Sequence, residues 1–181
     1  PVIPVIGINV TDGEMKDAIV EGRLDEGAAL KLLDLSERDR RLVFRLVYDL
    51  RLSKNKQIEV IDRLRDITRR DDCSVSGILD STGMKHILKD NDLNIPQKAR
   101  RVRHFIRKLR YPAIVRAEED FLEMTRTLNL GDGIRLAPPP SFEGDRYRID
   151  FQFGTIDELE RKLKKIDSIK DNKGLRKAVE G

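Results

Sequence analysis

Residues 98–110 hold the side chains of this chain that are best suited to binding an anion. The segment carries seven Lys or Arg residues and no Asp or Glu, while the whole chain has a net charge of only +4. Apolar residues recur at helical spacing from Ala99 to Leu109, which predicts that this stripe faces a core and that the cationic side chains face outward together. Such charges repel one another unless an anion neutralises them, and the Arg guanidinium matches the oxygens of phosphate. The predicted phosphate contacts are Lys98, Arg100, Arg101, Arg103, His104, Arg107, Lys108 and Arg110.

The charge of this basic helix also has three interpretations that involve no nucleic acid. Carboxylates of the following helix, such as Glu118, Glu119 and Asp120, could pair with its cations inside the same molecule. Alternatively, the helix docks on an acidic protein partner, which makes the chain a protein–protein interaction module. An anionic membrane fits less well, because the apolar stripe is needed for the core. We therefore expect duplex DNA as the partner, bound through its phosphates, and keep the acidic protein as the alternative.

A second segment has the shape of a helix-turn-helix. Residues 37–50 carry apolar side chains at helical spacing, and a break at 51–53 precedes a further helix that starts at Ser53. Lys, Asn and Gln at the start of such a helix are side chains that reach phosphates and base edges. Two helices with a tight turn occur in many helical domains, so this pattern is the less specific of the two. The weaker DNA contacts it predicts are Ser53, Lys54, Asn55, Lys56 and Gln57.

Sequence motifs for catalysis and for cofactor binding are missing. The chain has no Gly-x-Gly-x-x-Gly, no Walker loop and no Gly-x-Ser-x-Gly. Its single cysteine, Cys73, and its two histidines leave few ligands for zinc. We therefore expect a protein that is not an enzyme and that takes no metal and no cofactor. No run of about 20 apolar residues is present, which argues against a membrane span.

The periodicity of the apolar residues predicts a mainly α fold. Helical spacing dominates from residue 11 to residue 111, and we expect a helical bundle there that includes the helix-turn-helix-like pair. Residues 112–166 are expected to form a helix, a β-hairpin and a second helix, because apolar residues alternate along 147–153. The remaining residues, 167–181, are expected to be a polar tail.

The predicted hairpin must bury its apolar side chains against another element. Two strands alone are only marginally stable in water, so the sheet of residues 112–166 must be buried against something. Either the helical part of the chain or a second copy could cover it, and a second copy is the natural solution, since most oligomers are symmetric assemblies of identical subunits. We therefore expect a homodimer. The residues predicted to form its interface are Tyr147, Ile149, Phe151, Phe153 and Leu159.

With these segments, the chain resembles the ParB family of chromosome and plasmid partition proteins. Residues 18–35 are similar to the family stretch I-x-x-G-x-[IL]-x-x-G-H-A-x-x-L-L-x-L, with Ala28 in place of the histidine. Residues 49–59 resemble the start of a family helix. Residues 148–160 resemble the strand and helix of the family's C-terminal dimerisation domain.

The resemblance implies binding of duplex DNA and self-association, and a place in the cytoplasm on the nucleoid. We find no counterpart in the sequence of the family's nucleotide-binding N-terminal domain, so we expect the chain to be a fragment of a longer protein. A partition ATPase is then an expected partner, through segments that precede Pro1.

Overall fold

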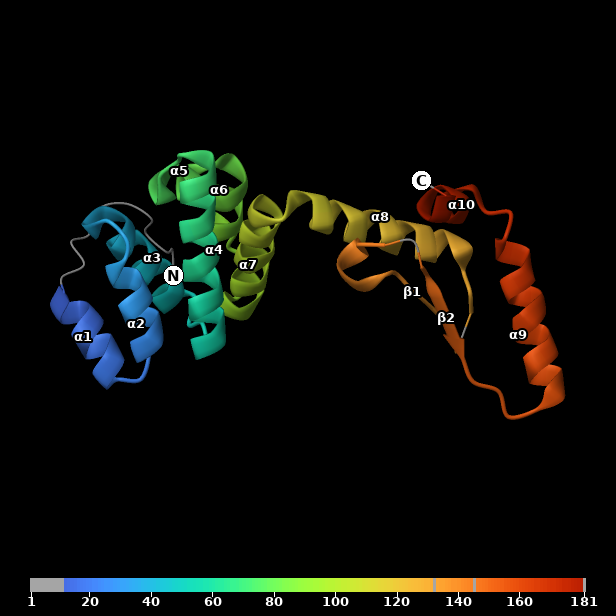
Figure 1. Cartoon of the computed structure of the whole chain (residues 1–181). Coiled ribbons are helices and arrows are strands. Elements are labelled where there is room, and N and C mark those ends of the chain that lie inside the picture. Colours follow the sequence, from blue (N-terminus) through green and yellow to red (C-terminus); the bar gives the residue numbers. More distant parts are fainter. Residues whose placement is uncertain (1–11, 132, 145, 181) are drawn as a thin grey trace. The chain divides into compact units, whose positions relative to one another are not determined.

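The computed structural model describes residues 12–131, 133–144 and 146–180 (Figure 1). The chain divides into two compact units, Pro1–Tyr111 (unit 1) and Pro112–Gly181 (unit 2). Its described part is mainly helical with one two-stranded antiparallel sheet, which confirms the predicted fold class. Residues 1–11, where the predicted helical domain begins, lie outside the described residues.

Unit 1 is built from helices alone within its described residues. Asn94 starts the last of them: its side chain accepts a hydrogen bond from the backbone N of Gln97 at 2.9 Å, and the Gln97 side chain accepts one from the backbone N of Asn94. This reciprocal capping box fixes where the helix begins. Pro112 then stops it after Arg110, because a proline disfavours helical geometry in the residue before it. The helices are α1 (Asp12–Val20), α2 (Glu26–Leu33), α3 (Glu37–Asp49), α4 (Lys54–Asp71), α5 (Val75–Asp80), α6 (Thr82–Lys89) and α7 (Ile95–Arg110).

Helix α4 is the central helix of unit 1 and packs against α2 and α7 (Figure 1). Val60, Ile61 and Leu64 of α4 are 0 % exposed, as are Val102 and Ile106 of α7. Residues 57–68 are buried or half-buried, so neighbours cover most of the middle of α4. The helix therefore serves as the rigid support for the elements around it.

The turn between α3 and α4 spans residues 50–53 and completes the helix-turn-helix-like pair. Arg51 has a φ of 49°, a left-handed backbone conformation that reverses the chain direction. Leu50 and Leu52 on either side are 2 % and 5 % exposed. The two leucines anchor the turn in the core, and Arg51 between them is exposed.

Unit 2 combines three helices and a hairpin among its described residues. In the hairpin, Ile134 pairs with Phe151 and Ala137 pairs with Arg148. The Phe121 ring of α8 stacks on Tyr147 with 6.2 Å between ring centroids, so α8 covers the start of the second strand. The elements are α8 (Pro112–Leu128), β1 (Ile134–Ala137), the 3-10 turn η1 (Pro140–Phe142), β2 (Arg148–Phe151), α9 (Ile156–Ile169) and α10 (Lys173–Glu180).

The predicted polar tail, residues 167–181, is mostly exposed in its described part, and most of it is helical. Helix α9 runs on to Ile169, which is 5 % exposed, and α10 follows. The Asn172 side chain caps α10 by accepting hydrogen bonds from the backbone N of Gly174 at 2.9 Å and of Leu175 at 3.1 Å. Ile169 and Leu175 both pack on the core of unit 2, and their burial holds this segment in place.

Candidate nucleic-acid interface

Helix α7 does not present all of its cations to water. Lys98 is 6 % exposed, and its Nζ donates a hydrogen bond to the carbonyl oxygen of Leu88 at 2.9 Å. The prediction that Lys98 faces outward to bind phosphate is therefore wrong. The physical reason is its spacing, because residues 98, 102 and 106 are four apart and share the buried face with Val102 and Ile106.

Two arginines of α7 are already paired with carboxylates of α4. Arg103 Nη2 lies 2.6 Å from Glu59 Oε2, and Arg110 Nε lies 3.1 Å from Asp66 Oδ2. The partners are seven residues apart on each helix, so α4 and α7 run in the same direction side by side. The prediction that these two arginines face water without a carboxylate partner is wrong.

The other cations of α7 differ in their surroundings. Arg101 is exposed and lies 3.6 Å from Asp90, which is half-buried. His104, Arg107 and Lys108 each have an interaction partner, so none of the three is a free cation. Arg100 is exposed and, among the described residues, has no ion pair. Of the predicted phosphate contacts on this helix, Arg100 is therefore the one best placed to receive an external anion.

The start of α4 also divides into used and available side chains. Gln57 is 3 % exposed; its Oε1 accepts from the backbone N of Asp25 at 3.0 Å, and its Nε2 donates to the carbonyl oxygens of Arg23 and Leu52. Gln57 thus joins two loops and is not available to DNA, contrary to the prediction. Lys54 lies 3.0 Å from Asp25, whereas Ser53, Asn55 and Lys56 are exposed.

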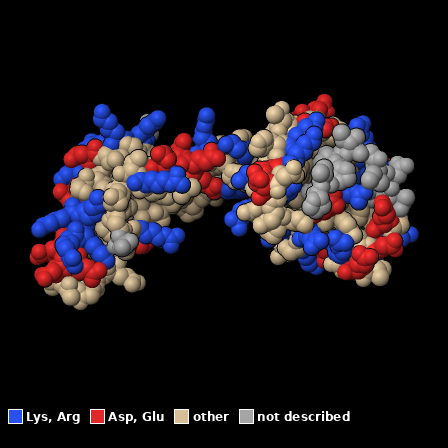
Figure 2. All heavy atoms as spheres, turned by 180° about the vertical axis from the view of Figure 1, so that it is seen from behind, with Lys and Arg blue, Asp and Glu red and all other residues tan. Residues whose placement is uncertain are grey.

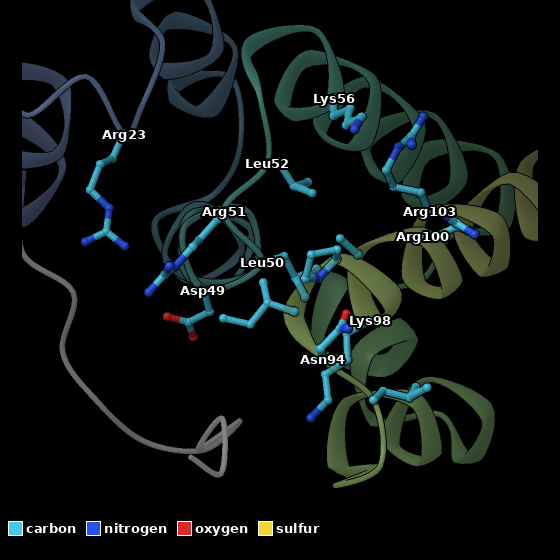
Figure 3. Close-up of a pocket in the computed structure, with 14 residues that line it drawn as sticks. Arg23, Asp49, Leu50, Arg51, Leu52, Lys56, Asn94, Lys98, Arg100 and Arg103 are labelled. Carbon is cyan, nitrogen blue, oxygen red and sulfur yellow. The ribbon is translucent and has the colours of Figure 1, made fainter.

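An open groove of about 960 Å³ lies in unit 1 between the α3–α4 turn and the first half of α7. Figure 3 shows Arg23, Arg51 and Asp49 on one side of it, and Lys56, Arg100 and Arg103 on the other. We call it the basic groove. It brings together residues from both predicted segments, Lys56 and Arg100, and adds Arg23 and Arg51, which the sequence did not single out. The lining residues are Arg23, Asp49, Leu50, Arg51, Leu52, Lys56, Leu93, Asn94, Ile95, Pro96, Lys98, Ala99, Arg100 and Arg103.

Positive charge dominates the basic groove. Within the described part of the chain, Arg51, Lys56 and Arg100 have no ion pair, and Asp49 is the carboxylate that lines the groove with them. Figure 2 shows Lys and Arg interspersed with Asp and Glu on the visible face of the molecule. The excess of positive charge around the groove is therefore a local feature. A ligand that enters the groove meets cations from several elements at once.

Arg23 and Asp49 lie together on one side of the basic groove. The Arg23 guanidinium lies 3.8 Å from the centroid of the Tyr48 ring and donates to the Tyr48 hydroxyl, which holds the cation in place. Burial raises the pKa of the Asp49 carboxyl above its ordinary value, and the positive charges of Arg45 and Arg23 oppose this rise. The groove therefore contains one carboxyl group whose ionised form is disfavoured.

Unit 2 presents a different kind of surface. Tyr147 and Ile149, predicted for the dimer interface, pack against the core of their own unit. Phe151 ends β2, and its ring centroid lies 6.4 Å from that of Phe153, which is 50 % exposed. On α9, the predicted Leu159 is half-buried. Ile156 and Leu163, which the sequence analysis missed although they share its helical spacing, are 66 % and 50 % exposed. We call Phe153, Ile156, Leu159 and Leu163 the open apolar face.

Three further observations concern metal binding, cysteine reactivity and membrane spans. In that part of the chain, no three His, Cys, Asp or Glu side chains are grouped to hold a metal ion. Burial raises the pKa of the Cys73 thiol, and Asp71 adds to the rise, which is the opposite of what activates a nucleophilic cysteine. Nor is any helix there long and apolar enough to span a bilayer.

No family model, no curated protein and no solved structure matches this chain. The resemblance to the ParB family therefore stays a prediction that rests on the sequence motifs. What can be argued further about function comes from the geometry of the basic groove and of the open apolar face.

Proposed function

We propose that the chain binds duplex DNA through its sugar–phosphate backbone, with the basic groove as the contact site. One observation carries the proposal: Arg51, Lys56 and Arg100 come from three separate elements, have no ion pair among the described residues, and line one open groove. A role in DNA partition and a place on the nucleoid rest on the sequence resemblance alone.

Phosphate is the anion that suits this lining. Three cations around one groove repel one another, and a strand that carries a phosphate on every nucleotide relieves the repulsion at several points. The guanidinium groups of Arg51 and Arg100 each offer paired N–H donors, which match two phosphate oxygens. The groove also has apolar lining from Leu50, Leu52 and Ile95, against which deoxyribose can pack.

The test is a charge reversal with a matched control. We expect the triple variant Arg51→Glu, Lys56→Glu, Arg100→Glu to lose binding to a random duplex at low salt, by about 100-fold or more. In the parent protein, the affinity should fall with salt with a log–log slope of about −0.9 for each phosphate contacted.

The control reverses three other exposed cations of unit 1 that do not line the groove. Arg38→Glu, Arg69→Glu, Lys89→Glu changes the same residue types and the same net charge. It should retain most of the binding. Equal loss in both triple variants would show that only the overall charge matters, and a parent protein that binds no duplex at all would favour an acidic protein as the partner.

We also propose that the open apolar face of unit 2 binds a second copy of the chain. Three of its apolar side chains are at least half exposed: Phe153, which follows the end of β2, and Ile156 and Leu163 on α9. Acidic residues gather in the first half of α9 (Asp157, Glu158, Glu160) and basic residues follow (Arg161, Lys162, Lys164, Lys165). Two antiparallel copies of α9 would therefore bring opposite charges together around the apolar contact.

Sedimentation velocity tests the dimer. The parent chain should sediment as a dimer, and Leu163→Asp should sediment as a monomer because a buried carboxylate is costly. Leu33→Asp, at a comparably exposed leucine of unit 1, is the control and should remain dimeric. A monomeric parent, or a Leu33→Asp variant that dissociates as well, would remove this proposal.

A further inference from the structure

We infer that the basic groove takes the phosphate ridge of one DNA strand and does not select bases. This inference rests on the proposed function. Base edges lie at the floor of the DNA grooves, so reading them requires a helix or strand that protrudes into the duplex. Arg51, Lys56 and Arg100 instead line a concave surface, which complements the protruding backbone.

The element that should protrude is packed inside the unit. In a helix-turn-helix protein the second helix enters the major groove of DNA. Here the second helix is α4, whose residues from 57 to 68 are buried or half-buried. The side chains of Asp62 and Asp66 reach the surface in part, but they are paired with Lys31 and Arg110. In the exposed first turn, Lys54 is paired with Asp25. Helix α4 therefore supports the groove and does not lie in the DNA.

The amide side chains around the groove are already engaged. Bidentate recognition of adenine by Asn or Gln uses the amide oxygen and nitrogen together. The oxygens of Asn94 and Gln97 accept backbone hydrogen bonds at the start of α7, and both ends of the Gln57 amide are bonded within the protein. The groove thus offers cations for phosphate but no unengaged amide oxygen for a base.

Selection from a randomised duplex library tests the inference with the full chain. Several rounds of binding and sequencing should enrich no motif. Two unrelated duplexes of equal length should bind within about twofold of each other, because recognition of each specific base pair would change the affinity by roughly 5- to 150-fold. Enrichment of a motif, with tenfold or greater preference, would overturn the inference while leaving DNA binding in place. Failure to bind any pool would instead remove the proposed function itself.

Two point variants sharpen the result. Asn55 is exposed at the start of α4 and does not line the groove, so Asn55→Ala should leave the affinity for every duplex unchanged. Arg100→Lys keeps the charge but loses the fork that recognises guanine. It should weaken binding by the same small factor on all sequences. A loss confined to some sequences in either variant would show base recognition and contradict the inference.

Discussion

The two units of this chain solve the problem of apolar burial differently. In the described part of unit 1, 22 buried apolar residues form one cluster, whereas the cluster of unit 2 has five. Unit 1 thus closes a large core and carries a charged groove, although Val20, Leu30 and Leu33 remain exposed on it. Unit 2 closes only a small core and leaves Phe153, Ile156 and Leu163 exposed. This difference underlies the two proposals, that unit 1 binds its ligand through electrostatics and that unit 2 gains stability by association with a second copy.

The largest effect expected from this difference is in the core of unit 1. Ile61 is 0 % exposed, and Ile61→Ala should destabilise unit 1 by about 2–5 kcal/mol, since truncation removes buried surface and leaves a cavity. Leu163→Ala in unit 2 should change the stability of the monomer by less than about 0.5 kcal/mol. Hydrogen exchange read by mass spectrometry measures the two units separately.

Protein concentration distinguishes a loss of dimer from a loss of core packing in unit 2. The effect of Leu163→Ala on exchange protection should grow with protein concentration, because the truncated side chain matters only in the dimer. The effect of Ile61→Ala on unit 1 should not depend on concentration. A concentration-independent loss of several kcal/mol in Leu163→Ala would mean that Leu163 belongs to a closed core, and the contrast between the units would disappear.

Alanine substitutions of Lys98 and Arg100, two residues apart on α7, should have smaller and opposite effects on stability and DNA binding. Lys98→Ala removes the donor from the carbonyl of Leu88, near the end of α6, and should cost about 1–3 kcal/mol of stability. It should leave the salt dependence of DNA binding unchanged. Arg100→Ala should do the reverse: stability changes by less than about 0.5 kcal/mol, and the salt slope falls by about 0.9.

Thermal unfolding and a salt titration on the same two variants check this pair. The result that would contradict the structural assignment is a reduced salt slope in Lys98→Ala without loss of stability. That outcome would place the Lys98 ammonium on DNA and not on Leu88.

Helices and strands could be predicted well from the sequence, whereas the contacts of individual side chains could be predicted less well. Alternation along 147–153 predicted the second strand, and β2 runs from Arg148 to Phe151. Helical spacing predicted α3, the turn and α4. Helices and strands depend on residues that are close in the sequence, so the spacing of apolar residues is enough to predict them.

What sequence reasoning missed depends on partners far along the chain. The carboxylate that pairs with Arg103 belongs to Glu59, 44 residues earlier, and Gln57 joins Arg23 to Leu52 across loops that only the fold brings together. Lys98 is an exception, because its spacing to Val102 and Ile106 was readable and would have placed it on the buried face. For cations on an amphipathic helix, the phase of each residue therefore matters more than the count of charges.

The smallest expected effect concerns Asp49, the carboxylate that lines the basic groove. Burial raises the pKa of this carboxyl, and the positive charges of Arg45 and Arg23 oppose the rise. Because the folded-state pKa lies above the unfolded one, the neutral form stabilises the fold: this contribution is present below the unfolded pKa and is lost as pH rises through the folded pKa. As pH falls through that range, the groove also loses its negative charge, so DNA binding should strengthen.

Asp49→Asn fixes the neutral state and should remove this part of the pH dependence of both stability and DNA binding. At neutral pH its affinity for a random duplex should rise by roughly twofold, since a unit charge about 8 Å away in water-like surroundings is worth about 0.5 kcal/mol. Asp17→Asn, an exposed carboxylate on α1 outside the groove, makes the same chemical change and serves as the control. If both variants raise the affinity equally, the ligand senses only net charge; if Asp49→Asn alone does so, the phosphate backbone lies close to Asp49, and the position of the bound strand in the groove is thereby fixed at one point.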